Sequence, residues 1–174
     1  MDITFIKLIT PDKKIASSLE SWSNDSTITH LIRPNQNQKD LERFVPVTVA
    51  SLEKQLEDFS IHLIYLDGLL VGEMNFLADP IHLYKKDPGT AWIGLVIGEE
   101  SARGKGIGIQ AIKHLEEVIR EQKFPRIELG VFEFNIRAIK LYEKLGYQEI
   151  GRIADFTYWR GKMWQDLRME KLLK

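Results

Sequence analysis

The 174-residue sequence contains no cysteine. This absence excludes disulfide bonds, thiolate-metal sites and a cysteine nucleophile together, and it fits a reducing cytoplasm. No window approaches the roughly 20 apolar residues of a membrane-spanning helix, and the opening MDITFIKLITPDKK has no basic stretch before an apolar core. We therefore expect a soluble, cytoplasmic protein without a membrane partner.

The sequence also lacks an excess of charge of either sign. Its formal net charge is -1, so nothing in the whole-chain charge favours a nucleic acid as partner. It has no internal repeat and no linker rich in proline, glycine or serine. A hydrophobic content of 44% over this length is enough for one well-buried core. We expect a single domain spanning residues 1–174.

The apolar pattern of the first half predicts a strand, helices and a hairpin. An Asp-Gly pair between two apolar runs is a strong hairpin signal, and residues 23–47 are too polar and irregular for a long helix. The expected segments are a strand at 3–10, a helix at 11–22, an irregular region at 23–47, a helix at 48–59 and a hairpin within 61–78.

The second half predicts the order β-loop-α-β-α-β-β. AWIGLVIG, residues 91–98, is apolar on both alternations, which is typical of a central strand buried on both faces. A helix from Ile107, a strand at 126–131, a helix at 136–145 and strands at 147–153 and 162–172 follow. The expected fold class is a mixed α/β sheet.

The loop between the first strand and the first helix of this half is rich in glycine. In it glycine alternates with Arg103, Lys105 and Ile107. Backbone without side chains can approach a ligand closely, and the first amides of a helix have no partner within the helix. The loop is therefore predicted to bind phosphate.

Two other phosphate-binding motifs fit this loop less well. A nucleoside-triphosphatase loop needs serine or threonine after the lysine, but Lys105 precedes Gly106. The spacing Gly106-x-Gly108-x-x-Ala111 matches a dinucleotide motif, with Glu128 roughly where a ribose-binding acid would lie. Five residues intervene between strand and loop, however, and too little chain follows for repeated βαβ units.

Two motifs in series resemble those of a known superfamily. RGKGIG, residues 103–108, follows a buried strand, and NIRAIKLYEKLGY, residues 135–147, follows in turn. Together they resemble the GNAT superfamily of acetyl-CoA-dependent N-acyltransferases, from about Leu69 to the C-terminus. Residues 151–173 also resemble the tail of the ribosomal-protein-alanine and spermidine acetyltransferase branch. The resemblance implies the GNAT fold, a mostly antiparallel central sheet flanked by helices with a β-loop-α-β-α core that binds acetyl-CoA.

The resemblance also implies roles for individual residues. The backbone of Leu95, Val96 and Ile97 would pair with the pantetheine arm like an added strand. The amides of Arg103, Gly104, Lys105, Gly106, Ile107 and Gly108 would hold the pyrophosphate. Asn135 would touch the cofactor, and Tyr142 would protonate the departing CoA thiolate. Taken singly, Asn135 is more commonly a helix cap and Tyr142 a core aromatic, and it is their joint match to one family that favours the functional roles.

The general base is less well defined by the sequence. Several family members carry a glutamate on the strand after the cofactor helix, but the matching position here is Gly130. Glu73, Glu128 and Asp155 remain as alternatives, with Glu73 ranked first, and a water-mediated route is equally compatible. No histidine or acidic residues show metal-ligand spacing.

These observations predict an N-acetyltransferase that uses acetyl-CoA to acetylate a primary amine by direct attack. Protein N-termini, polyamines and other small amines all remain as acceptors, and the tail strands are a candidate surface for a homodimer. The alternatives are a non-catalytic acyl-CoA-binding or interaction module on the same fold and, less favoured, a dinucleotide-binding enzyme.

Overall fold

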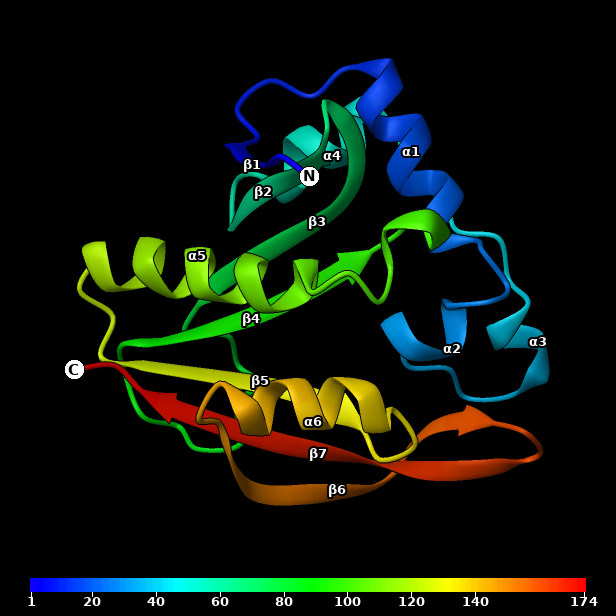
Figure 1. Cartoon of the computed structure of the whole chain (residues 1–174). Coiled ribbons are helices and arrows are strands. Elements are labelled where there is room, and N and C mark those ends of the chain that lie inside the picture. Colours follow the sequence, from blue (N-terminus) through cyan, green and yellow to red (C-terminus); the bar gives the residue numbers. More distant parts are fainter.

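The computed structural model describes all 174 residues and contains one seven-stranded sheet (Figure 1). The strands follow the order β1-β2-β3-β4-β5-β7-β6, and only β4 and β5 pair in parallel. Their bounds are β1 Ile3–Lys7, β2 Phe59–Leu66, β3 Leu69–Ala78, β4 Thr90–Ile97, β5 Arg126–Phe132, β6 Gln148–Trp159 and β7 Lys162–Leu172. The prediction of a mixed, mostly antiparallel sheet is confirmed.

Six α-helices accompany the sheet, and several begin at the residues that their sequences favour. Asp12 accepts a hydrogen bond from the Ile15 amide, and Thr48 and Ser51 form a reciprocal capping box. The helices are α1 Lys13–Ser23, α2 Thr29–Ile32, α3 Gln38–Leu41, α4 Val49–Gln55, α5 Ile107–Glu121 and α6 Ile136–Lys144. None is long and apolar enough to cross a bilayer.

Both hairpins turn through residues with positive φ. Asp67 and Gly68 have φ of 49° and 80°, as the Asp-Gly signal predicts, and Arg160 and Gly161 form an equivalent turn at 49° and 78°. The second turn lies later than expected, because β6 continues past Ile153 to Trp159. A register shift between Ile153 and Thr157 lets the strand resume pairing with β7 after the interruption.

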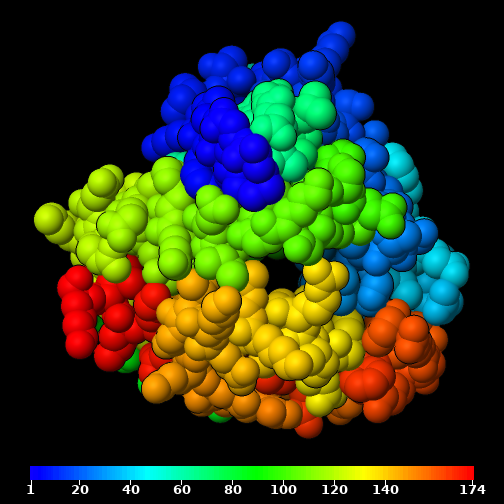
Figure 2. Space-filling model, viewed as in Figure 1, coloured from blue at the N-terminus to red at the C-terminus, as the bar shows by residue number.

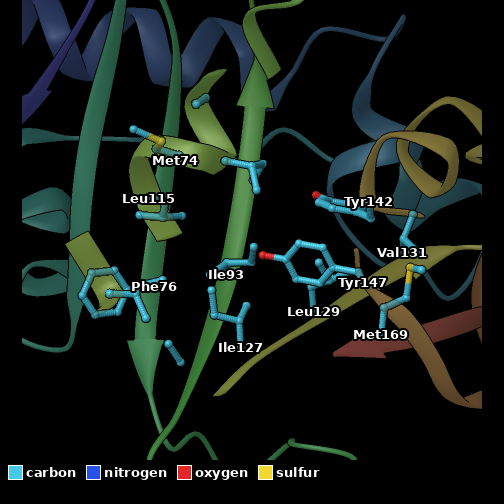
Figure 3. Packing of buried hydrophobic residues seen from close by; sticks show 14 of the residues in the cluster. Met74, Phe76, Ile93, Leu115, Ile127, Leu129, Val131, Tyr142, Tyr147 and Met169 are labelled. Carbon is cyan, nitrogen blue, oxygen red and sulfur yellow. The ribbon is translucent and has the colours of Figure 1, made fainter. Parts of the chain in front are cut away.

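One face of the sheet is covered by α5 and α6 (Figure 1). It contributes buried side chains such as Met74, Ile93 and Leu129 to the main hydrophobic cluster (Figure 3). The opposite face carries Ile61 and Leu63, which pack with Leu8 in a smaller cluster beside α1.

Three local expectations need correction. The helix predicted at 48–59 ends at Gln55, and Phe59 already belongs to β2. Charged side chains of a surface helix are expected to face solvent, but Glu116 of α5 is 5% exposed because its carboxylate pairs with Lys171 of β7 at 2.8 Å. In β4 only Thr90, Ala91 and Ile93 are fully buried; the rest of the strand is half-buried.

Candidate functional site

A gap opens in the middle of the sheet because β4 and β5 pair over only three residues. Their parallel pairing runs from Thr90 to Trp92 on β4 and ends there, whereas β4 stays paired with β3 through Ile97. Alternate amide and carbonyl groups beyond Trp92 therefore point away from β3 into the gap without a strand partner. Leu95, Val96 and Ile97, the predicted pantetheine-binding residues, lie on this unpaired stretch.

The glycine-rich loop closes the gap at the N-terminus of α5. The backbone amides from Gly104 to Ile109 make no hydrogen bond within the protein. Gly106 is the N-cap of α5, with φ of 77° and no side-chain cap, so the helix entrance presents amides and the positive end of its dipole. This is the arrangement expected of an anion site.

Arg103 has a different position from the other loop residues. Its amide donates to the carbonyl of Glu100, and its guanidinium donates to the carbonyls of Ile97 at 3.1 Å and Gly98 at 2.5 Å. A terminal nitrogen also lies 3.4 Å from the Asp25 carboxylate. Arg103 therefore fastens the end of β4 to the loop, and its amide and two of its three guanidinium nitrogens are engaged within the protein.

Two other cations lie nearer to the free amides. Lys105 is exposed within the loop, and Arg137 of α6 reaches across the gap toward Gly104. A terminal nitrogen of Arg137 lies 3.7 Å from the position that a Cβ on Gly104 would take. Arg137 was not predicted from the sequence, although its place two residues after Asn135 at a helix N-terminus was a usable signal.

A tryptophan also unnoticed in the sequence fixes the end of β4. Trp22 of α1 lies flat against Gly98, where an added Cβ would come within 2.0 Å of the indole ring. Its indole nitrogen donates to the Glu99 carboxylate at 2.9 Å. Gly98 thus has no side chain because Trp22 occupies its space.

Helix α6 forms the other wall of the gap and carries Asn135 and Tyr142. Asn135 accepts a hydrogen bond from the Ala138 amide at 3.3 Å, so its cap role is present in the structure, while its amide nitrogen donates to no protein group. Tyr142 is 8% exposed, and burial raises its pKa to about 12. Its phenol therefore keeps its proton at neutral pH.

The hydroxyl groups of Tyr142 and Tyr147 point from the α6 side toward β4 (Figure 3). The two rings meet edge to face with centroids 5.6 Å apart, and Tyr142 makes no hydrogen bond with the protein. The space-filling view shows an opening between the green surface of the α5 entrance and the yellow and orange surface of α6 (Figure 2). The unpaired backbone of β4, the free amides and Tyr142 therefore border one opening.

Glu73 lies on the opposite face of the sheet, on β3, one strand away from the gap. It pairs with Val96 across β3 and β4, and it is half-buried. Burial raises the pKa of its carboxyl group to about 7, although Asn75 lowers it by donating to both carboxylate oxygens at 3.2 Å. A carboxylate that titrates near neutrality is suited to accept a proton.

The other two carboxylates considered as bases have different surroundings. Glu128 is fully buried and accepts hydrogen bonds from the amides of Tyr84 and Lys85 and from Arg126. Its oxygens are thus committed to protein donors. Asp155 is exposed at the interruption of β6, with φ of 48°. Of these three candidate bases we therefore favour Glu73, which is partly exposed and whose pKa is raised to about 7.

A separate shallow cavity of about 410 Å³ lies at the other end of the strands. Leu8, Phe59 and Phe124 are among its lining residues, and none of the predicted site residues borders it. The predicted site residues are gathered instead around the gap between β4 and β5.

Comparisons with known proteins agree with this geometry. A family model described as the acetyltransferase (GNAT) family matches residues 20–147. The spermine/spermidine N(1)-acetyltransferase of Bacillus subtilis (strain 168) is 35% identical over 95 residues, which are 54% of this chain and 62% of that protein. The match thus spans less than two thirds of the relative's length. Other relatives are named aminoglycoside N(6')-acetyltransferase type 1, from Klebsiella pneumoniae, and N-alpha-acetyltransferase 30, from Dictyostelium discoideum, each 31% identical over shorter shares of their lengths.

Solved structures show the same fold over the whole chain. A ribosomal-protein-alanine N-acetyltransferase from Brucella melitensis superposes with a TM-score of 0.75 at 21% identity, covering 99% of this chain and 100% of that one. A spermidine N-acetyltransferase from Vibrio cholerae, solved with CoA and spermine, gives 0.74 at 17% identity, covering 98% and 95%. The predicted fold is confirmed, and the chain belongs to the acetyltransferase (GNAT) family.

Proposed function

We propose that the protein transfers the acetyl group of acetyl-CoA to a primary amine by direct attack, without a covalent enzyme intermediate. The observation that carries this proposal is the coincidence of three features at one opening. These are the unpaired backbone of β4, the free amides from Gly104 to Ile109, and the buried hydroxyl of Tyr142. Membership of an acetyltransferase family supports the same chemistry.

The residues around the opening fit acetyl-CoA by their chemistry. A pyrophosphate suits the free amides from Gly104 to Gly108, with Lys105 and Arg137 supplying positive charge. The amide groups of a pantetheine arm suit the unpaired backbone of Leu95 to Ile97, as in the addition of a strand to a sheet edge. Asn135 has a free amide nitrogen at the mouth of α6. Arg103, predicted as an amide donor, is left out of the proposed set.

The reaction requires two proton movements, and two side chains are placed for them. The bound thioester supplies an electrophilic carbonyl carbon and a thiolate leaving group. Glu73 accepts a proton from the acceptor ammonium, directly or through water, so that the nitrogen lone pair is free. Tyr142 donates its proton to the sulfur as the carbon–sulfur bond breaks. The products are an N-acetylated amine and CoA thiol. Of the two protons that the nitrogen loses, one restores the Tyr142 hydroxyl through solvent and the other is released, which leaves Glu73 ionised for the next turnover.

For the acceptor we propose a small polyamine or related amine ahead of a protein N-terminus. The relative with 35% identity is a polyamine acetyltransferase, and an acidic side chain, Glu73, lies one strand away from the opening. We also propose that the tail strands β6 and β7 form the interface of a homodimer.

Of the two alternative functions, a non-catalytic acyl-CoA-binding module would keep the amide-lined gap without needing Tyr142. The dinucleotide alternative is wrong, because it needs successive parallel strands and only β4 and β5 are parallel.

The proposal is tested in two stages. Thermal stabilisation by acetyl-CoA, CoA, NAD and NADP is measured in parallel, because a ligand that binds the native state raises its stability. We expect stabilisation by acetyl-CoA and CoA. Release of CoA thiol is then followed with spermidine, an aminoglycoside and a peptide with a free N-terminus. Binding of acetyl-CoA without turnover of any amine would favour the binding module, and no binding of either CoA compound would overturn the assignment.

A further inference from the structure

A buried carboxylate occupies the space beside Gly130 on β5. A Cβ placed on Gly130 would lie 2.6 Å from the Oδ2 atom of Asp166 and 3.0 Å from the ring of Trp92. Asp166 belongs to the neighbouring strand β7 and is 2% exposed. The acid at this point of β5 is therefore supplied from the next strand, and Gly130 leaves the room for it.

Asp166 stands at the same level of the sheet as Glu73, on the other side of the gap. Glu73 pairs with Val96, and Asp166 pairs with Phe132. The parallel pairing of Trp92 with Glu128 brings Val96 and Phe132 level, since each lies four residues further along its strand. Alternation of side chains puts all four on the face opposite α5 and α6.

The two carboxyl groups are thus separated by the opening itself. Gly130, beside which the Asp166 carboxylate lies, is on β5, two strands away from the β3 strand that bears Glu73. Two strand spacings amount to roughly 10 Å of backbone separation before the splay is added. Glu73, Gly94 and Gly130 are all half-buried, so this face of the sheet is not closed over at the gap.

Asp166 is the last member of a chain of alternating charges on this face. Successive partners lie 2.5 to 3.8 Å apart in the order Lys85, Glu170, Arg126, Glu128, Arg168, Asp166. In this series of ion pairs Glu170 and Glu128 each lie between two cations, whereas Asp166 stands at the end. Asp166 has only Arg168, which uses Oδ2 at 2.7 Å, and Oδ1 accepts no hydrogen bond from the protein.

The surroundings of that free oxygen suit a cation. Phe132, paired with Asp166, and Trp92, beside Gly130, place aromatic rings on this side of the gap, and aromatic faces attract ammonium groups. Arg168 is held back from the gap by its hydrogen bond to the carbonyl of His82 and by its stacking on Trp92, 4.8 Å from the ring centroid. Burial raises the pKa of Asp166, and Arg168 opposes that rise.

We propose that Asp166 binds a second ammonium group of the acceptor while Glu73 faces the amine that is acetylated. The acceptor is then a molecule with at least two amines joined by a carbon chain, and Asp166 is its specificity-determining residue. This inference rests on the proposed function and narrows it to diamines and polyamines. Nothing in the sequence motifs indicated Asp166, because its place beside Gly130 comes from the pairing of β5 with β7.

The test compares a diamine with a monoamine of the same carbon chain, 1,4-diaminobutane and butylamine. The wild-type protein is expected to show a kcat/KM at least tenfold higher for the diamine. Asp166→Asn should reduce kcat/KM for the diamine by about 10- to 100-fold, the range for a lost hydrogen bond to a charged group. It should change kcat/KM for butylamine much less. Asp155→Asn, which removes an exposed carboxylate from the adjacent strand, is the matched control and should change neither.

Three outcomes overturn the inference. One is equal kcat/KM for the two amines in the wild-type protein, which needs no variant. Another is an equal loss for both amines in a folded Asp166→Asn protein, which indicates a structural role through Arg168. If that variant does not fold, Asp166→Ala is combined with Gly130→Asp, which empties the space beside Gly130 and returns an acid to it. Restored preference for the diamine supports the inference, and a combined variant that is unfolded or has no preference counts against it. Failure of the proposed function would look different from failure of this inference, because the protein would then release CoA with neither amine.

Discussion

The role proposed for Glu73 predicts a particular dependence of activity on pH. Burial raises the pKa of its carboxyl group from 4.5 to about 7, so at pH 6 only about a tenth of the molecules carry the ionised form that can accept a proton. Activity should therefore rise roughly tenfold per pH unit below the midpoint and level off above it. The acceptor amine also titrates, so the informative quantity is the ratio of wild-type to Glu73→Gln kcat/KM at each pH, in which the amine's ionisation cancels.

Glu73→Gln keeps the shape of the side chain and removes the base. At pH 8 we expect kcat to fall by about 10² to 10⁴-fold, the usual contribution of general base catalysis, and the ratio to decline as the pH falls below 7. Asn75→Ala supplies a second check. Asn75 donates to both Glu73 oxygens and lowers the pKa, so its loss should move the rise in activity to higher pH. The assay is CoA thiol release between pH 5.5 and 9.

Protein stability gives a separate readout of the same group. Because the folded-state pKa is raised, the unfolded chain releases its proton first as pH rises from about 4.5, and the native state loses stability until about pH 7. A shift of this size corresponds to at most about 3 kcal/mol, and partial exposure reduces it. Glu73→Gln should therefore gain free energy of unfolding over the wild type at pH 8 but not at pH 4. A ratio of activities that is flat from pH 5.5 to 8, with equal stability at pH 8, would refute the reasoning.

Three further substitutions test the remaining site residues. Tyr142→Phe should lower kcat by about 10²-fold while leaving the Kd for acetyl-CoA and the Tm nearly unchanged, since only the hydroxyl is lost; unchanged kcat makes Tyr142 a packing residue. Gly106→Val should weaken acetyl-CoA binding, measured by calorimetry, because φ of 77° is strained for valine and the added side chain would enter open space next to the free amides; an unaltered Kd in a folded protein would contradict the loop assignment. Asn135→Ala should cost about 1 kcal/mol of unfolding free energy as a lost cap, and a raised KM for acetyl-CoA is expected in addition if its free amide touches the cofactor.

Local sequence determined most of the elements and the motif that led to the family. Glycine next to basic residues at a helix entrance, Asn135 at the start of α6 and Asp67-Gly68 between apolar runs each act through neighbouring backbone, and each lies where it was predicted. The chemistry of such short segments depends on dihedral angles and capping, which the residues themselves set. Element ends were less well placed, because tertiary pairing extends β6 beyond Ile153 and shortens α4.

The environment of each candidate acid was decided only by the tertiary structure. Glu73, Glu128 and Asp155 are equivalent carboxylates in the sequence, but one is half-buried with a raised pKa, one is committed to buried donors and one is exposed. Asp166 reaches Gly130 from a strand 36 residues further along. Likewise Arg103 is withdrawn from the phosphate loop by carbonyls at the end of β4. Burial, charge pairing and the reach of a side chain depend on which strands become neighbours, and that order is a property of the assembled sheet rather than of any segment.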